Sequence, residues 1–211
     1  MPNRYLPIGI SLENRKCLVV GGGKVALRKI EILLNFEVDM TVVAPEPENK
    51  ITYHARHKKL KLEKREYKSP EASEYGLVIS ASDDRDVNKK VHDDCLKANI
   101  PVNVVDNPDL CTFIFPAIIM RDCLTISMLS DGKAPFLSGQ LRAILEDLFP
   151  DHWSKIAHYA ALFRIKVNRR WKGEPQKKAD CFARFVGADW KKLLKELSES
   201  EIDEELDNFL E

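Results

Sequence analysis

The sequence predicts an α/β fold in which a parallel sheet, covered by helices on both faces, is followed by a helical region. Three observations carry this prediction. Short apolar runs alternate with segments of helical spacing through residues 1–112, a glycine-rich turn joins the first run to the first helical segment, and helical spacing alone continues from residue 154. Strands that alternate with helices favour a doubly wound parallel sheet.

Five apolar runs are predicted as the strands of this sheet, because each is short and is bounded by polar or glycine-rich residues. They span residues 17–20, 38–44, 60–67, 77–81 and 102–105. Helices are predicted after the first run, where apolar residues recur between Val25 and Leu34, and after the fourth, where Val87, Val91 and Leu96 face inward.

The pattern changes after about residue 112. Two further strand-like runs are predicted at 113–119 and 124–129. Pro135 suits the first turn of a helix, because the N–H that proline lacks would be unbonded there. That helix carries an apolar stripe up to residue 148, and residues 196–211, with eight acidic side chains and no basic one, predict a solvated or frayed end.

The composition excludes several classes of partner. The 211 residues include 33 basic and 33 acidic side chains, so no net charge points to nucleic acid. No run approaches the roughly 20 apolar residues of a membrane span, and no secretory signal is expected at the N-terminus. The five cysteines have no C-x-x-C spacing, so neither a disulfide framework nor a metal site is expected, and a cytoplasmic location is predicted.

The glycine-rich turn directly follows the first strand and opens the first helix. Its sequence, Gly21-Gly22-Gly23-Lys24-Val25-Ala26, fits the G-x-G-x-x-A fingerprint of Rossmann-type NAD-binding domains. Gly21 would permit the tight turn, Gly23 would let the backbone approach a pyrophosphate, and Ala26 would let the helix pack closely on the strand. The alternative is a strand-to-helix turn that binds no ligand.

Residues at the ends of the later strands would complete a cofactor site. Pro45 and Glu46 follow the second strand, where Glu46 could bind the ribose hydroxyls. No arginine stands there to bind a 2′-phosphate, which favours NAD over NADP. Ser82 and Asp83 follow the fourth strand and are expected to contact the cofactor, although Asp83 and Asp84 could instead cap the next helix.

Asp106 follows the fifth strand and is the candidate catalytic residue. Loops at the carboxyl ends of such strands face the cofactor crevice, where a carboxylate could accept a proton during an oxidation. The alternative is that Asp106 only forms a side-chain turn before Pro108.

An ordered set of motifs resembles the precorrin-2 dehydrogenase / sirohydrochlorin ferrochelatase family, which includes the N-terminal half of siroheme synthase. The resemblance covers residues 4–150 well and the helical remainder only in length and character. The motifs are Leu6-Pro-Ile8, Val19 to Ala26 with Arg28-Lys29, Ala81 to Asp84 before Val87-Asn88, Asn103 to Asp106, Phe113 to Ala117, Ser127 to Pro135, and Leu141-Arg142.

The resemblance implies a fold and an activity. It implies a Rossmann domain over residues 1–112, a dimerisation region over 113–150 and a helical tetrapyrrole-binding domain over 151–211, in a homodimer. The implied reaction is NAD-dependent oxidation of precorrin-2 to sirohydrochlorin, with insertion of ferrous iron in many members. A competing hypothesis is a Rossmann-type NAD sensor without catalysis, for which the small size of the chain speaks.

Roles are carried over by matching position. Asp106 matches the catalytic aspartate, and Ser130 matches a serine of the tetrapyrrole pocket. Lys24, Val25, Pro45 and Glu46 match cofactor contacts. Asn103 and Lys133 are expected to contact substrate. The family often has Ser or Thr before the proline that opens the long helix, and Ala134 here removes that helix cap.

Precorrin-2 carries eight carboxylates, so a basic pocket wall is expected. Residues 152–192 hold eleven lysines and arginines against three acids, and Arg169 and Arg170 are the candidates for substrate binding. The alternative is a solvated helix face. For the metal step the histidines decide little, because His54-x-x-His57 lies in a charged stretch that predicts surface positions, while His152 and His158 could line the helical pocket.

Overall fold

The computed structural model describes residues 5–211. The chain divides into two compact units, one that ends at Phe115 and one from Pro116 to Glu211. None of the described helices is long and apolar enough to cross a membrane. The separate dimerisation and tetrapyrrole-binding roles of residues 113–150 and 151–211 stay predictions.

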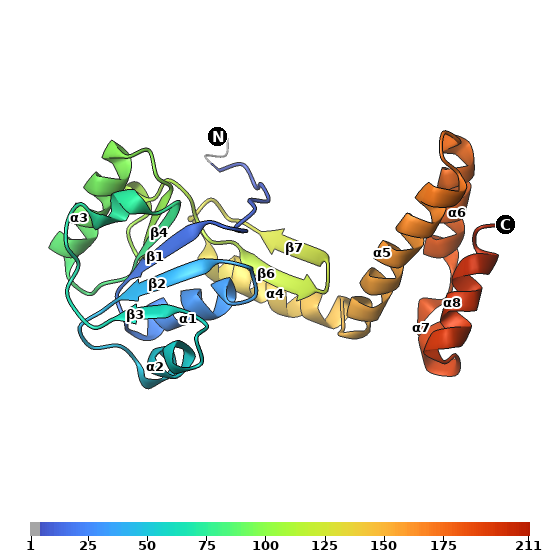
Figure 1. The fold of residues 1–211 in the computed structure, drawn as a ribbon, viewed down its shortest axis with the longest axis horizontal. Coiled ribbons are helices and arrows are strands. Elements are labelled where there is room, and N and C mark those ends of the chain that lie inside the picture. Colours follow the sequence, from blue (N-terminus) through green and yellow to red (C-terminus); the bar gives the residue numbers. More distant parts are fainter. Residues whose placement is uncertain (1–4) are drawn as a thin grey trace. The chain divides into compact units, whose positions relative to one another are not determined.

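The first unit is built on a five-stranded parallel sheet of order β3-β2-β1-β4-β5 (Figure 1). Its strands are β1 (Lys16–Val20), β2 (Asp39–Val43), β3 (Lys61–Glu63), β4 (Leu77–Ser80) and β5 (Val102–Val104). Its helices are α1 (Lys24–Leu33), α2 (Asn49–Arg56) and α3 (Arg85–Lys97), with the short 3-10 turns η1 (Glu71–Glu74) and η2 (Pro108–Leu110). The predicted α/β class is confirmed.

Both faces of this sheet are buried. On β1, Cys17 and Val19 pack with residues of α1 and α2, whereas Leu18 and Val20 pack with residues of α3. Successive residues of a strand point to opposite faces, so a sheet that is covered on both sides needs apolar residues at every position. This is why β1, in the middle of the sheet, reads as a continuous apolar run after Lys16.

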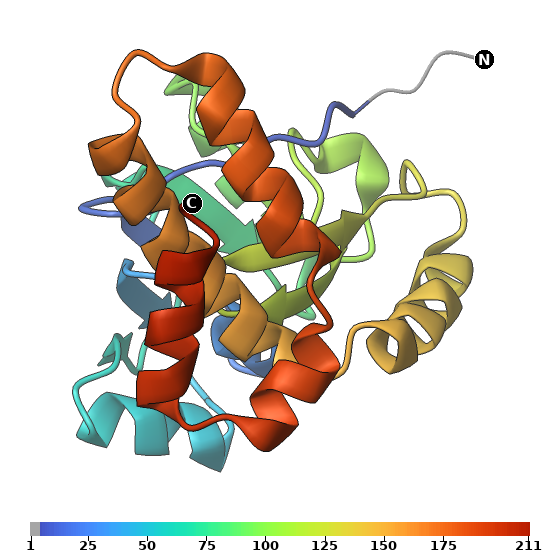
Figure 2. The same ribbon diagram turned by 90° about the vertical axis from the view of Figure 1, so that its right-hand side faces the viewer.

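The second unit combines a hairpin with helices. Its elements are β6 (Ala117–Arg121), β7 (Leu124–Met128), α4 (Pro135–Leu148), α5 (His152–Arg170), α6 (Pro175–Gly187), α7 (Trp190–Glu196) and α8 (Glu199–Asn208). The last four helices lie beside one another (Figure 2). Phe163 of α5 stacks on Phe185 of α6 at 5.2 Å between ring centroids, and the indole N–H of Trp190 donates to the carbonyl of Phe185 at 2.7 Å.

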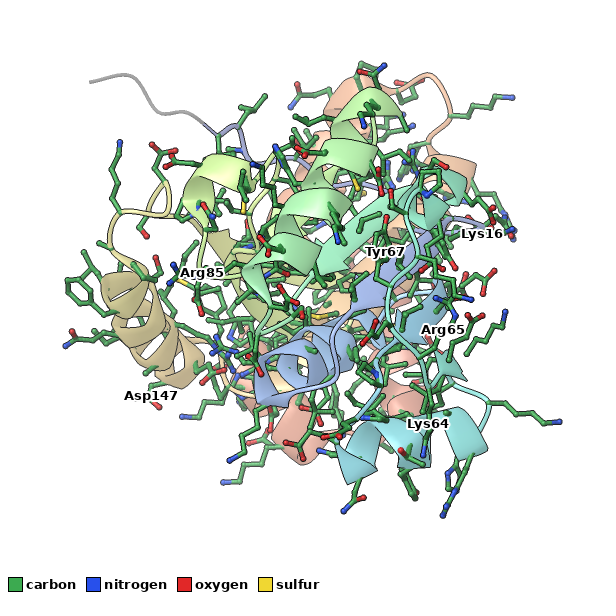
Figure 3. All side chains as sticks on the ribbon, turned by 90° about the vertical axis from the view of Figure 1, so that its left-hand side faces the viewer. Lys16, Lys64, Arg65, Tyr67, Arg85 and Asp147 are labelled. Atoms are coloured by element: carbon green, nitrogen blue, oxygen red, sulfur yellow. The ribbon has the colours of Figure 1, made fainter. Side chains whose placement is uncertain are left out.

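Two predicted strands are shorter than expected. The third strand ends at Glu63, because Arg65 turns to pair with Glu63 and Glu71, and the Tyr67 hydroxyl donates to Asp94 at 2.7 Å (Figure 3). The strand predicted at 113–119 begins only at Ala117. Before it, Phe113 and Phe115 pack on the core of the first unit, and Pro116 has no N–H for a ladder bond.

The acidic tail is folded, so the prediction of a solvated or frayed end is wrong. Residues Glu199–Asn208 form α8, which buries Ile202 and Leu206 in the helical core. Ser198 caps the helix in a capping box with Glu201, and Lys166 of α5 pairs with Asp207 at 2.8 Å. The acids therefore occupy only the outer face of an amphipathic helix.

Helix α2 was not predicted, and the surface position predicted for His54 is wrong. Ile51 and His54 are its two buried residues, and both ring nitrogens of His54 lack a hydrogen-bond partner among the described residues. Burial lowers the pKa of His54, and the nearby Lys59 lowers it further. A neutral imidazole here takes the place of an apolar side chain.

Candidate active site

The first two glycines of the turn are required by the packing of the chain itself. Gly21 has φ +114°, and a Cβ there would lie 2.2 Å from the carbonyl oxygen of Ala81. A Cβ on Gly22 would lie 2.7 Å from atoms of Ala44 and Pro47. The turn therefore packs between the loops that follow β2 and β4.

The space around Gly23 is open, and it shows whether the turn could accommodate a dinucleotide. A Cβ built on Gly23 has no neighbour within 4 Å, so nothing described in the chain requires glycine there. Gly23 is also the N-cap of α1, and no side chain caps this helix end. The first-turn N–H groups, which include those of the exposed Lys24 and Val25, are thus available to a pyrophosphate that approaches over Gly23.

The topology brings the other predicted cofactor contacts to the same edge of the sheet. Pro45 and Glu46 follow β2, and Ser82 and Asp83 follow β4. All five strands are parallel, so these loops and the glycine turn share the carboxyl edge. The strand order reverses between β1 and β4, which is where open α/β sheets bind ligands. Pro45 and Glu46 are exposed there.

Three neighbouring polar residues in the loop after β4 have different roles. Asp84 caps α3, since its carboxylate accepts from the N–H groups of Asp86 at 2.8 Å and Val87 at 3.3 Å. Asp83 does not cap this helix and is exposed. Ser82 is held by the buried Asn88, whose amide donates to the carbonyl of Ser82 at 2.8 Å.

Asn88 was missed in the sequence. It also accepts from the hydroxyl of Ser80 at 2.6 Å, so one side chain links the end of β4 to α3. The signal was an amide next to Val87 and Val91 on a helix face predicted to be apolar.

Asp106 lies in the turn after β5, at the same edge. Its φ is +58°, its side chain is exposed, and no hydrogen bond of its carboxylate is found within residues 5–211. The alternative of a side-chain turn before Pro108 is therefore wrong for this structure. An exposed, unbonded carboxylate in the left-handed region is available for a ligand.

Hydrogen bonds of Cys111 and Asn103 stabilise the segments on either side of the turn that carries Asp106. The Cys111 thiol accepts from the N–H of Val104 at 3.3 Å and lies 3.1 Å from the carbonyl oxygen of Val104, to which it can donate. The amide of Asn103 donates to the carbonyl of Phe113 at 3.0 Å. Asn103 is buried, so its predicted contact with substrate is not supported, and its amide instead ties β5 to the following segment.

Ser130 and Lys133 lie in the connection between β7 and α4. The hydroxyl of Ser130 accepts from the N–H of Ala134 at 3.3 Å, and Lys133 pairs with Asp131 at 2.9 Å. Ala134 is the N-cap of α4 and contributes no side-chain cap, as the sequence predicted. The Ser130 hydroxyl therefore bonds the N–H of the N-cap residue itself, and not the N–H groups of the first turn that a cap would bind.

The predicted basic residues lie at the end of α5, apart from that loop in the chain. Arg169 and Arg170 are exposed, and neither forms an ion pair within the described part of the chain. No hydrogen bond or ion pair described in residues 5–211 joins them to Ser130 or Lys133, and within those residues no cluster of three or more potential metal ligands exists. Their contact with substrate stays a prediction.

Comparison with known families shows which family the sheet-containing part of the chain belongs to. A family model described as "Putative NAD(P)-binding" matches residues 8–117, which hold the whole sheet and its helices. The chain belongs to this NAD(P)-binding family. The family supports a dinucleotide as the cofactor, while the binding of its pyrophosphate at the glycine turn stays a prediction.

Relatives of this NAD(P)-binding chain confirm the resemblance found in its motifs. The siroheme synthase of Nitrosomonas europaea is 40% identical over 168 residues, which cover 79% of this chain and 35% of that protein. The siroheme synthase of Psychrobacter cryohalolentis is 43% identical over 164 residues, 78% of this chain and 31% of that protein. The chain thus spans about a third of the length of these curated relatives.

A solved structure confirms the fold over nearly all of the chain. The protein named "SirC, precorrin-2 dehydrogenase" matches with a TM-score of 0.75 at 21% identity and covers 97% of this chain and 98% of its own. The helical region after the sheet is therefore part of the same fold as in that solved structure.

Proposed function

We propose that this protein oxidises precorrin-2 to sirohydrochlorin with NAD, as a step towards siroheme or a related tetrapyrrole. The observation that carries the proposal is the identity of about 40% to siroheme synthases over four-fifths of the chain. The carboxyl edge of the sheet supports it, because a dinucleotide turn and an unbonded carboxylate lie there together.

Each group at this edge has a proposed role. The N–H groups at the start of α1 bind the pyrophosphate, Glu46 binds the ribose hydroxyls, and Ser82 and Asp83 contact the cofactor from the β4 loop. NAD, when bound, supplies the acceptor for the hydride that leaves the macrocycle. The oxidation also releases one proton, which Asp106 accepts as general base. In the second unit, which does not contain this edge, Ser130, Lys133, Arg169 and Arg170 are proposed to bind substrate carboxylates.

We also propose that NAD is preferred over NADP. Glu46 is exposed at the position expected for the ribose, and its charge would repel a 2′-phosphate. Calorimetric titration should give weaker binding of NADP than of NAD. In the variant Glu46→Gln the difference between the affinities for NAD and NADP should become smaller. Equal affinities of the wild type for both cofactors would remove Glu46 from this role.

The decisive experiment is anaerobic incubation of the protein with precorrin-2 and NAD, followed by absorption spectra. Conversion to the spectrum of sirohydrochlorin, matched by formation of NADH, is the expected result. A protein that binds NAD but leaves precorrin-2 unchanged would instead be a sensor. Addition of ferrous iron to the product then tests insertion, in which the metal is a substrate and Asp106 could accept the pyrrole protons.

The proposed assembly is a homodimer. Helix α4 exposes several large apolar side chains among the described residues, and such a stripe marks an interaction surface. These residues are Phe136, Leu137, Leu141, Ile144 and Leu148. A cytoplasmic location is proposed as well, because NAD is available there and four of the five cysteines are buried free thiols.

A further inference from the structure

Lys29 is a cation on α1 that reaches the segment after β5. Its Nζ lies 4.3 Å from the centre of the Phe115 ring, and Phe115 in turn packs beside Phe113 at 5.5 Å between ring centroids. Both rings pack on the core face that α1 covers. The ammonium is therefore fixed against an aromatic ring rather than extended into solvent.

No carboxylate contacts the ammonium group of Lys29 among the described residues. Burial lowers the pKa of Lys29 and the neighbouring Arg28 lowers it further, while Cys111 and, less strongly, Asp106 act in the opposite direction, so both lie within electrostatic reach. None of the ion pairs within 4.0 Å in residues 5–211 includes Lys29. A half-buried cation without a contacting carboxylate is unfavourable, and a contact with one aromatic ring returns only about 0.5–1 kcal/mol.

We propose that Lys29, held over the Phe115 ring, is a substrate-binding residue that holds one carboxylate of the tetrapyrrole. The inference rests on the proposed function. A substrate with eight negative charges is repelled by Asp106, and a fixed cation within electrostatic reach of that residue offsets part of the repulsion. Because the Phe115 ring already orients the ammonium, little side-chain freedom is lost on binding.

The test compares two neighbouring charge removals. Lys29→Gln should raise the KM for precorrin-2 about tenfold or more, the effect of losing one charge-assisted hydrogen bond, while the Kd for NAD stays unchanged. Arg28→Gln removes the same charge from an exposed neighbour and should leave KM as in the wild type. An unchanged KM in folded Lys29→Gln, or an equal rise in both variants, would overturn the inference.

A binding measurement separates this inference from the proposed function. Sirohydrochlorin carries the same carboxylates, and its affinity can be titrated by fluorescence without turnover. If the wild type binds sirohydrochlorin but does not oxidise precorrin-2, a weaker affinity in Lys29→Gln alone supports Lys29 while the proposed function fails. If the wild type oxidises precorrin-2 and Lys29→Gln binds sirohydrochlorin normally, Lys29 alone is refuted. If the wild type neither oxidises nor binds, both fail.

Discussion

At the scale of single residues, Asp106 combines an exposed carboxylate with a left-handed backbone. Asp106→Asn removes the base but keeps a residue that tolerates positive φ, so the fold should persist. Turnover should fall about a hundredfold or more, which is the usual contribution of a general base. The measurement is kcat for precorrin-2 oxidation, with the Kd for NAD as the control for an intact site.

Asp106→Ala is the less informative variant. Alanine lacks the local stabilisation that lets Asn and Asp adopt this backbone, so a lost activity would mix chemistry with a distorted turn. A folded Asp106→Asn protein with normal turnover would leave Asp106 without a role as base. Normal oxidation with failed iron insertion would move its role to the second reaction.

Gly23 and Gly22 make a matched pair for testing the cofactor turn. Gly23→Asp places its side chain in open space and should leave folding intact, yet its charge would occupy the pyrophosphate site and abolish NAD binding. Gly22→Ala should instead lower the thermal midpoint, because its Cβ would collide with Ala44 and Pro47. Calorimetry and thermal unfolding separate the two effects. Normal NAD binding by Gly23→Asp would place the cofactor elsewhere.

At the scale of elements, the basic end of α5 carries a prediction about substrate charge. Arg169 and Arg170 are exposed and form no ion pair within the described chain, so their replacement by Gln together should cost little stability beyond the contact of Arg170 with the Trp171 ring and the favourable charge in the last turn of α5. The KM for precorrin-2 should rise about tenfold, with no change in NAD affinity. Added salt should produce the same rise in the wild type, because exposed charges are screened. Wild-type kinetics in the double variant would assign both residues to a solvated face.

The elements that the sequence predicted correctly are those with a local signal. The strands β1 and β4 are apolar at all but one position, β2 ends in Val42 and Val43, and the turn at Gly21 needs only three glycines in a row to be recognised. Helix α2 has no such signal, since the inward position next to Ile51 is taken by His54. The folded tail was missed because eight charges outweigh the two buried residues Ile202 and Leu206.

The site could be predicted only where its residues adjoin a motif. Gly23, Glu46 and Asp106 follow strands, so topology alone places them at one edge. Lys29 is influenced by Asp106, about eighty residues further along the chain, and the Cys111 thiol bonds Val104, about seven residues earlier. Neither interaction leaves a local pattern in the sequence. Asn103 adjoins the Asp106 motif, yet its burial could not be seen from the sequence.

At the scale of the whole molecule, the exposed stripe on α4 predicts a homodimer. Ile144→Asp places a charge in the centre of this stripe and should shift the protein towards a monomer in light scattering at micromolar concentration. Val186→Asp is the control, because Val186 is also an exposed apolar residue, 79% exposed, but lies on α6 and outside the stripe. A wild type that is monomeric at that concentration, or a dimer that persists in Ile144→Asp, would contradict the prediction.

In the proposed homodimer, the same stripe would make the stability of each chain depend on the concentration of its copies. Association that occurs only between folded chains adds free energy in proportion to the logarithm of concentration. The melting temperature should therefore climb as a sample is concentrated. A newly made chain in a cell with few others would keep its apolar helix in water, where proteases and aggregation act first. Scarcity would thus shorten the lifetime of this protein, and abundance would prolong it.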